Sequence, residues 1–151
     1  MIIFSSKPQK IFLWFKKRNR DKKMTEFKFY DRPWGGYLIL PENYGAVGPL
    51  KNPNKFLFIL PGEQLSWQYH NYRAEEWYVL EGNLEINLSK NDIMNMWTPC
   101  PHNQYYYIDV EERHSCRNVG NSMGIIAETW VEKGGQTSEA DIIRVSDKYK
   151  R

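Results

Sequence analysis

Short apolar runs broken by proline and glycine constrain the fold of this chain more than any other feature. The breaks between residues 29 and 62 are Pro33, Gly35, Gly36, Pro41, Gly45, Gly48, Pro49, Pro53, Pro61 and Gly62. Helical periodicity is hard to sustain across such spacing. Further on, Leu84-Glu85-Ile86-Asn87-Leu88 alternates strictly between apolar and polar residues, as a half-buried strand does. The pattern predicts an all-β chain of short strands.

Other runs rich in strand-forming residues extend this prediction. They cover residues 55–60, 76–80, 105–110 and 124–131. Many short strands separated by regular turn signals are typical of a barrel or a sandwich, and composition alone does not choose between the two. We expect one helix near the end of the chain, over residues 138–143, with Ser138 as its N-cap.

The first 23 residues differ from the rest in charge. They carry a formal charge of +7, whereas the remaining 128 residues carry −4. Three readings are open: a disordered basic tail, a surface-binding helix anchored by Trp14 and Phe15, or residues upstream of a start at Met24. Of these we favour a disordered or artefactual extension. This gives a division into a basic extension, 1–23, and a folded domain, 24–151.

Length, charge and cysteine usage exclude several classes of protein. A chain of 151 residues is one domain with room for a real core. Its mildly acidic main part does not indicate a nucleic-acid surface. No stretch reaches the roughly 20 apolar residues that a membrane span needs. Two cysteines, Cys100 and Cys116, are too few for a disulfide framework and indicate reduced thiols in the cytoplasm.

Four side chains form a candidate metal site. Gln68 and His70 are two residues apart, so on a strand they leave the same face, and Glu75 follows after a short turn. His114 lies in another strand-like run and could close the site from across a barrel. Imidazole, carboxylate and amide donors suit zinc, manganese, iron or nickel. The alternative is that these histidines are ordinary core or surface residues.

The same segment carries a resemblance to a known family. Within residues 61–82, matches to the pattern PGxxLSLQxHHHRAEHWxVVxG fall on Pro61, Gly62, Leu65, Ser66, Gln68, His70, Arg73, Ala74, Glu75, Trp77, Val79 and Gly82. Blocks at residues 32–37, at Lys55, at residues 108–118 and at residues 141–151 match in the same order. The chain therefore resembles the type II phosphomannose isomerase family of cupins from about residue 29 to its end.

The resemblance implies a fold and a metal site. The fold is the cupin double-stranded β-helix, a jelly-roll-like barrel, here with a short C-terminal helix. The family's metal ligands fall on Gln68, His70, Glu75 and His114, and the implied cofactor is a divalent metal: zinc, with manganese, cobalt or nickel as alternatives. The sequence departs from the family pattern at Asn71, Tyr72, Glu76, Asp109 and Glu111.

The resemblance also implies an activity, the interconversion of mannose 6-phosphate and fructose 6-phosphate in support of GDP-mannose and polysaccharide synthesis. A metal would stabilise the enediolate intermediate. The substrate is a small phosphorylated sugar, and Lys55, Arg73 and Arg144 are the candidate catalytic residues that would clamp its phosphate. Two alternatives stay open: a metal- and sugar-binding cupin without catalysis, and a cupin enzyme acting on another sugar. A homodimer is possible by analogy with other cupins.

Overall fold

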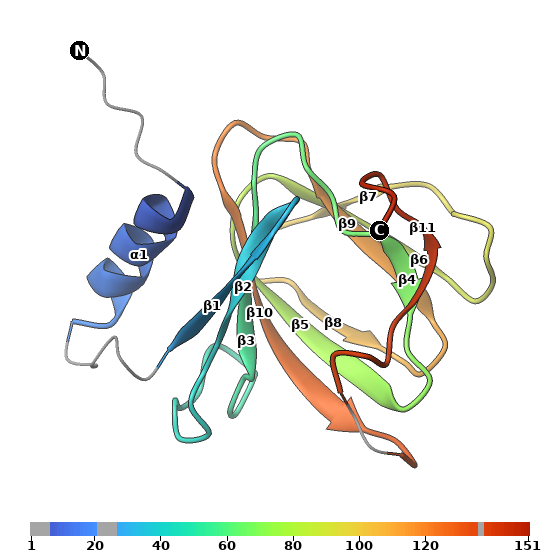
Figure 1. The fold of residues 1–151 in the computed structure, drawn as a ribbon, viewed down its shortest axis with the longest axis horizontal. Coiled ribbons are helices and arrows are strands. Elements are labelled where there is room, and N and C mark those ends of the chain that lie inside the picture. Colours follow the sequence, from blue (N-terminus) through green and yellow to red (C-terminus); the bar gives the residue numbers. More distant parts are fainter. Residues whose placement is uncertain (1–6, 21–26, 136–137) are drawn as a thin grey trace.

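The computed structural model describes residues 7–20, 27–135 and 138–151. In this part of the chain, two antiparallel sheets face each other and one helix lies outside them (Figure 1). The helix is α1 (Lys7–Arg18), and the strands are β1 (Lys28–Arg32), β2 (Gly35–Ile39), β3 (Lys55–Ile59), β4 (Trp67–Tyr69), β5 (Arg73–Glu81), β6 (Leu84–Ser89), β7 (Thr98–Cys100), β8 (Tyr105–Ile108), β9 (Arg113–Asn118), β10 (Gly124–Glu132) and β11 (Ile143–Ser146).

The topology is that of the cupin fold. The larger sheet has the order β1-β2-β3-β10-β5-β8 and the smaller one the order β11-β4-β9-β6-β7. Strands far apart in sequence are neighbours in both sheets, so the chain crosses repeatedly from one to the other. This confirms the predicted all-β cupin architecture.

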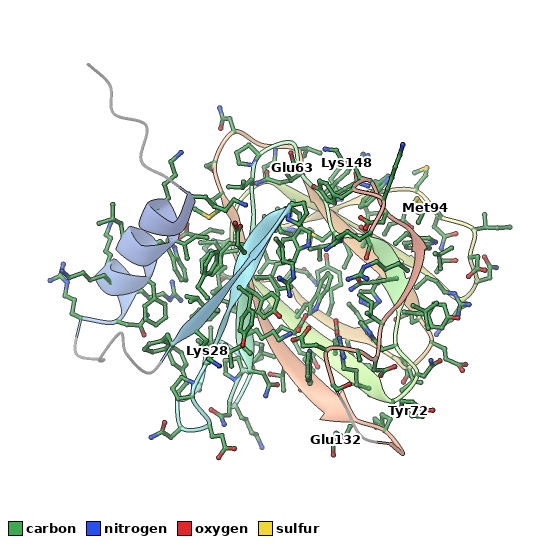
Figure 2. The ribbon with its side chains drawn as sticks, in the orientation of Figure 1. Lys28, Glu63, Tyr72, Met94, Glu132 and Lys148 are labelled. Carbon is green, nitrogen blue, oxygen red and sulfur yellow. The ribbon has the colours of Figure 1, made fainter. Side chains whose placement is uncertain are left out.

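Two apolar clusters hold the sheets in place. The first fills the space between the sheets and includes Trp77, Val79, Ile86 and Ile126. The second lies on the outer face of the larger sheet, where Phe56, Phe58 and Ile125 are fully buried. Figure 2 shows side chains filling both the barrel interior and the gap between α1 and the sheet. Strands buried on both faces explain why β3 reads as a continuous apolar run.

A hairpin at the start of the domain depends on close backbone packing. Gly35, at the first position of β2, has φ +148°, and a Cβ there would lie 1.7 Å from the carbonyl oxygen of Phe58 on the adjacent strand. Any larger residue would push β2 away from β3. Because β2 carries Tyr37 and the hairpin carries Trp34, this packing also positions two side chains that line the interior cavity.

The structure differs from the sequence expectation at the N-terminus. Residues 7–18 form α1, whereas we expected a disordered or artefactual extension over 1–23. Ile11 and Phe15 are buried against the larger sheet, and Trp14 Nε1 donates to Glu81 Oε1 at 2.8 Å. The apolar residues that suggested a surface anchor therefore pack on the protein's own barrel. Residues 1–6 and 21–26 lie outside the described part, and the domain boundary at Met24 stays a prediction.

The predicted C-terminal helix is wrong. Residues 138–142 form a turn, in which the N–H of Asp141 donates to the carbonyl of Ser138 at 3.1 Å, and the extended strand β11 follows. The Asp141 carboxylate explains the difference, because it accepts from the backbone N–H groups of Asn71 and Tyr72 at 2.9 Å each. These bonds tie the segment to the loop before β5 and prevent a helical turn from continuing.

The packing of α1 can be tested by truncating Phe15, whose side chain is fully buried. We expect Phe15→Ala to lower the free energy of unfolding by about 3–5 kcal/mol, because it leaves a cavity under the helix. Urea denaturation measures this. Leu13→Ala, on the exposed side of α1, should change stability by no more than about 0.5 kcal/mol. Equal, small effects of both substitutions would show that α1 does not pack on the sheet.

Candidate metal centre and cavity

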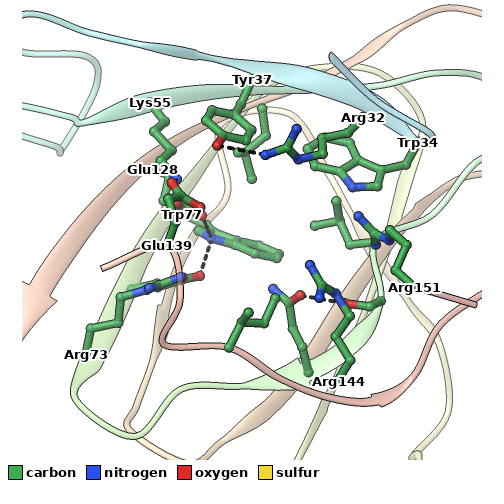
Figure 3. A pocket seen from close by; sticks show the side chains of 16 residues that line it. Arg32, Trp34, Tyr37, Lys55, Arg73, Trp77, Glu128, Glu139, Arg144 and Arg151 are labelled. Atoms are coloured by element: carbon green, nitrogen blue, oxygen red, sulfur yellow. Dashed lines mark hydrogen bonds and ion pairs between the residues drawn. The ribbon is translucent and has the colours of Figure 1, made fainter. Parts of the chain in front are cut away.

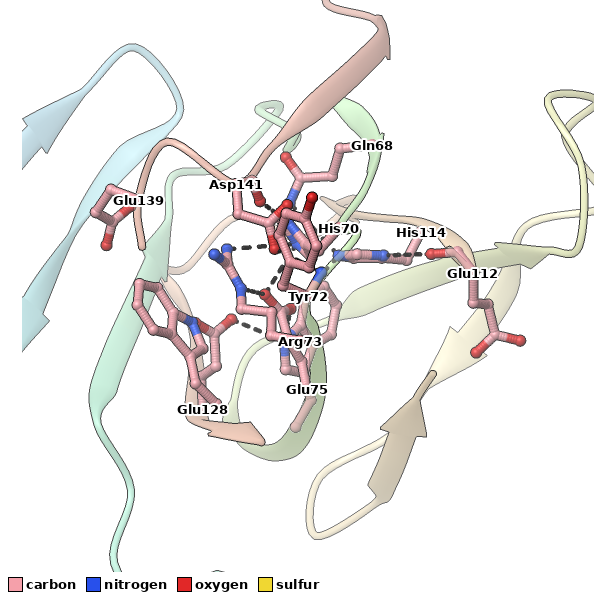
Figure 4. A network of polar contacts seen from close by, with 12 residues as sticks. Gln68, His70, Tyr72, Arg73, Glu75, Glu112, His114, Glu128, Glu139 and Asp141 are labelled. Carbon is pink, nitrogen blue, oxygen red and sulfur yellow. Dashed lines mark hydrogen bonds and ion pairs between the residues drawn. The ribbon is translucent and has the colours of Figure 1, made fainter. Parts of the chain in front are cut away.

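The buried carboxylate of Glu75 gathers three candidate ligands into one place. His70 Nε2 lies 2.9 Å from Glu75 Oε1, and His114 Nε2 lies 3.4 Å from Glu75 Oε2. The donor atoms of His70, Glu75 and His114 all lie within 4.8 Å of one another, and all three residues are buried. They come from the residue after β4, from β5 and from β9, so the packing of the two sheets brings them together (Figure 4).

The outer nitrogen of each imidazole is fixed by the backbone. His70 Nδ1 lies 2.6 Å from the carbonyl oxygen of Asp141, and His114 Nδ1 lies 2.9 Å from that of Glu112. Each Nδ1–H therefore donates to a carbonyl, which leaves Nε2 to face Glu75. Metal-binding histidines are oriented in this way by an acceptor behind the ring. The three residues fit a divalent cation in both donor type and direction.

The turn before His114 keeps a conformation that suits glycine. Glu111, which stands where the family pattern has glycine, adopts a φ of +63°. Its N–H donates to the carbonyl of His70 at 2.8 Å. A left-handed conformation costs a non-glycine residue roughly 1–2 kcal/mol. The backbone at Glu111 thus adopts the left-handed conformation that links the two histidine segments, although the residue there is not glycine.

The fourth predicted ligand, Gln68, lies beside the other three. It pairs with His114 across β4 and β9, and its amide Nε2 lies 3.5 Å from His114 Nε2. Its Oε1 accepts from Ser66 Oγ at 2.6 Å. In this orientation the amide nitrogen faces the site, and a half-turn of the amide would present the oxygen instead. The role of Gln68 as a ligand stays a prediction.

Charges around the cluster shift the pKa values of its members. Burial raises the pKa of Glu75, but the charge of His70 and hydrogen bonds from both histidines outweigh it and hold that pKa well below its usual range. Burial lowers the pKa of His114, whereas the hydrogen bond to Glu75 and the charge of Glu75 raise it, with a net increase. Because a metal would have to displace the proton on His114, binding should release protons.

An open cavity lies next to the cluster and has an empty volume of about 540 Å³, mouth included. Arg32, Arg144 and Arg151 line one side of it, and Lys55, Arg73, Glu128 and Glu139 line the other (Figure 3). Burial first, and then the charges of Arg151 and Arg32, lower the pKa of Arg144. Three guanidinium groups gathered on one side of a cavity are suited to binding an anion.

The three predicted catalytic cations differ in what they contact. Lys55 Nζ forms an ion pair with Glu139 and stacks on the rings of Tyr37 and Trp130. Arg73 donates to Glu75 at 3.1 Å and to the carbonyl of Ser138 at 2.6 Å. Both are thus occupied by protein groups.

The guanidinium of Arg144, on β11, makes no hydrogen bond or ion pair with any other residue that the structure describes. Of the three cations it has the guanidinium best placed for a ligand. The catalytic roles of all three stay predictions.

Sequence reasoning missed several cavity residues. Arg32 and Arg151 stand in the first and last blocks of the family resemblance, so their place in those blocks was a usable signal. Glu128 is an acidic residue within the apolar run of β10 and is 4 % exposed. Burying a carboxylate in a core strand costs free energy unless it is hydrogen-bonded or paired. This was the only sequence signal for Glu128. Glu139 had none.

The comparisons with known proteins give the family. The sequence model described as "Mannose-6-phosphate isomerase C-terminal" matches residues 18–147. The chain belongs to this family. The mannose-1-phosphate guanylyltransferase of Salmonella montevideo is 32% identical over 143 residues, which cover 95% of this chain and 27% of that protein. The alginate biosynthesis protein AlgA of Pseudomonas putida is 33% identical over 120 residues, which cover 80% of this chain and 22% of that protein.

Solved structures support the fold alone. The capsular polysaccharide assembling protein CapF of Staphylococcus aureus superposes with a TM-score of 0.61 at 13% sequence identity, over 80% of this chain and 34% of that one. Drosophila melanogaster CENP-C, in its complex with CAL1, superposes with a TM-score of 0.59 at 13% identity, over 82% of this chain and 95% of that one. Such low identities carry no statement about activity.

The prediction that this chain interconverts mannose 6-phosphate and fructose 6-phosphate is wrong as an assignment of function. The similar proteins are named for guanylyltransferase activity and for alginate or xanthan biosynthesis, and the chain spans about a quarter of their length. The word isomerase stands in the family description, which names the family and not the reaction of this chain. The resemblance identified the family correctly, but the reaction does not follow from it.

The described part of the chain contains no helix that is long and apolar enough to cross a membrane.

The cavity carboxylate Glu128 gives a pH-dependent prediction. Burial, and then the charge of Glu75, raise the pKa of Glu128 from 4.5 to about 7, against the opposing charges of Lys55 and Arg73. Because the folded state holds this proton more tightly than the unfolded chain, its contribution to stability is full below pH 4.5 and is lost as the pH rises through 7. Glutamine at this position stays neutral at every pH. Over this range the free energy of unfolding of Glu128→Gln should therefore rise relative to that of the metal-free wild type, by up to about 3 kcal/mol.

Urea unfolding of both proteins from pH 4 to 9 measures the change. The slope of the difference with pH is the readout, because the amide also alters the bonds to Trp77 and Trp130 by a constant amount. Glu132→Gln, an exposed change at the end of the same strand, should give a flat difference. A flat difference for Glu128→Gln as well would contradict the raised pKa.

Proposed function

We propose that this chain binds a divalent cation through His70, Glu75 and His114, with Gln68 as a fourth ligand, and a small phosphorylated sugar in the adjoining cavity. The observation that carries the proposal is the convergence of two imidazole Nε2 atoms on one buried carboxylate, with each Nδ1 held by a backbone carbonyl. Zinc is the metal we propose, since two imidazoles, a carboxylate and one further position match its preferred coordination. A bound cation would polarise a ligand oxygen as a Lewis acid.

The ligand side of the proposal rests on charge. Arg32 donates to Tyr37 Oη at 3.3 Å, and Arg151 pairs with Asp147 at 2.7 Å, so both are held in place by protein groups. Arg144 lies beside them and opposite Gln68, its partner across β4 and β11. An anion bound between the three guanidinium groups would therefore lie close to the metal ligands. A phosphate ester could reach both the arginines and the cation.

The relatives suggest where such binding is used. They are named for mannose-1-phosphate guanylyltransferase activity and for the biosynthesis of alginate and xanthan. We therefore place this chain in GDP-mannose and polysaccharide synthesis, in the cytoplasm, as a metal- and sugar-phosphate-binding cupin. A homodimer stays a prediction.

One experiment tests both halves of the proposal. Zinc-loaded protein should contain one equivalent of metal. Inorganic phosphate at ten times its dissociation constant should raise the melting temperature by about 3–5 °C. His114→Ala should lose the metal, because it removes a ligand from the centre of the site. Arg144→Gln should keep the metal and lose the stabilisation by phosphate.

Arg113→Gln is the matched control. Arg113 precedes His114 but pairs with Asp92 and stacks on Tyr69, away from the cavity. It should retain both metal and phosphate binding. Less than half an equivalent of metal in the wild type, or phosphate stabilisation that survives Arg144→Gln, would refute the corresponding half of the proposal.

A further inference from the structure

The two sides of the cavity differ in the charge they offer a ligand. The side formed by Arg32, Arg144 and Arg151 presents three cations, whereas Glu128 presents an anion on the opposite side (Figure 3). Trp77 lies between them, with its indole N–H turned toward Glu128. A ligand that fills the cavity therefore meets donors at one end and an acceptor at the other.

Two indole groups hold the Glu128 carboxylate in place. Trp130 Nε1 donates to Oε1 at 2.7 Å, and Trp77 Nε1 donates to Oε2 at 2.9 Å. A carboxylate offers about four acceptor positions, so these two bonds leave acceptor capacity on both oxygens. Because the residue lines the cavity, that capacity is available to a ligand.

The neighbouring cations do not neutralise this carboxylate directly. Glu128 forms no ion pair within the described residues, since Lys55 pairs with Glu139 and Arg73 pairs with Glu75. A buried carboxylate without a paired cation destabilises the folded protein. Glutamine would also accept a hydrogen bond from an indole and would carry no charge. Support of the two tryptophans therefore does not by itself account for a carboxylate at this position.

We propose that Glu128 is a specificity-determining residue, which accepts hydrogen bonds from the hydroxyl groups of a ligand whose phosphate is held by the arginines. This inference rests on the proposed function. The ligand class is a polyhydroxylated phosphate ester, because hydroxyl groups donate to the carboxylate while the ester phosphate accepts from guanidinium groups. The site would then discriminate against phosphate esters of the same charge that lack hydroxyl groups.

Two ligands with six carbons and one phosphate separate the two ends of the cavity. Mannose 6-phosphate carries hydroxyl groups and n-hexyl phosphate carries none. At pH 8, calorimetric titration of zinc-loaded wild type should show at least about tenfold tighter binding of mannose 6-phosphate, since hydrogen bonds to a charged acceptor are among the stronger ones. Glu128→Gln should lose most of this preference because it binds mannose 6-phosphate more weakly. Its affinity for hexyl phosphate should change less than about twofold.

Glu132→Gln is the control on the same strand and should keep the wild-type preference. If Glu128 has a purely structural role, Glu128→Gln should bind both ligands more weakly by the same factor, and that result would overturn the proposal. So would an unchanged preference in Glu128→Gln, or no preference in the wild type, a measurement that does not depend on the folding of any variant.

The metal content and the binding of inorganic phosphate are measured alongside. If the wild type holds zinc and phosphate but does not distinguish the two esters, the inference about Glu128 fails and the proposed function stands. If the wild type binds neither zinc nor phosphate, the proposed function fails. In that case, a wild type that also shows no preference for mannose 6-phosphate over hexyl phosphate would overturn the inference about Glu128 as well.

Discussion

The burial of the Glu75 carboxylate is the constraint on which the rest of this site depends. A carboxylate that is 2 % exposed must be compensated by hydrogen bonds and positive charge. Glu75 receives them from His70, His114, Arg73 and Trp77, which come from β5, from β9 and from the loop before β5. A divalent cation would replace the protons of the histidines as the compensating charge, which links metal binding to the stability of the barrel.

Much of the fold could be predicted because its signals are local. The alternation over residues 84–88 and the apolar run over 55–60 correspond to β6 and β3. The candidate metal donors could be named because a spacing of two residues predicts that Gln68 and His70 leave the same face of a strand, although β4 ends at Tyr69 and His70 follows it. What failed depends on distant contacts. The C-terminal turn is set by bonds between Asp141 and the loop at residues 71–72. Likewise, α1 is stabilised by packing on the face of a sheet whose strands lie further along the sequence.

The cavity shows the same limit. Lys55 and Arg73 had the right residue type to bind phosphate, but their partners, Glu139 and the carbonyl of Ser138, lie far along the sequence. Charge alone could not reveal that they are occupied. The family resemblance indicated one fold and a set of candidate metal ligands. It did not fix the reaction, because a shared fold can hold different ligands. The arginines and Glu128 are the residues of this chain that would select its ligand.

X-ray absorption spectroscopy of the zinc-loaded protein tests the central claim most directly, because it reports the atoms bound to the metal. The account predicts two imidazole nitrogens at about 2.0–2.1 Å together with oxygen donors at a similar distance. Sulfur scattering at about 2.3 Å, which would indicate Cys100 or Cys116 as a ligand, would contradict it. A spectrum without imidazole scattering would do the same, because the Glu75 cluster would then not be the metal site.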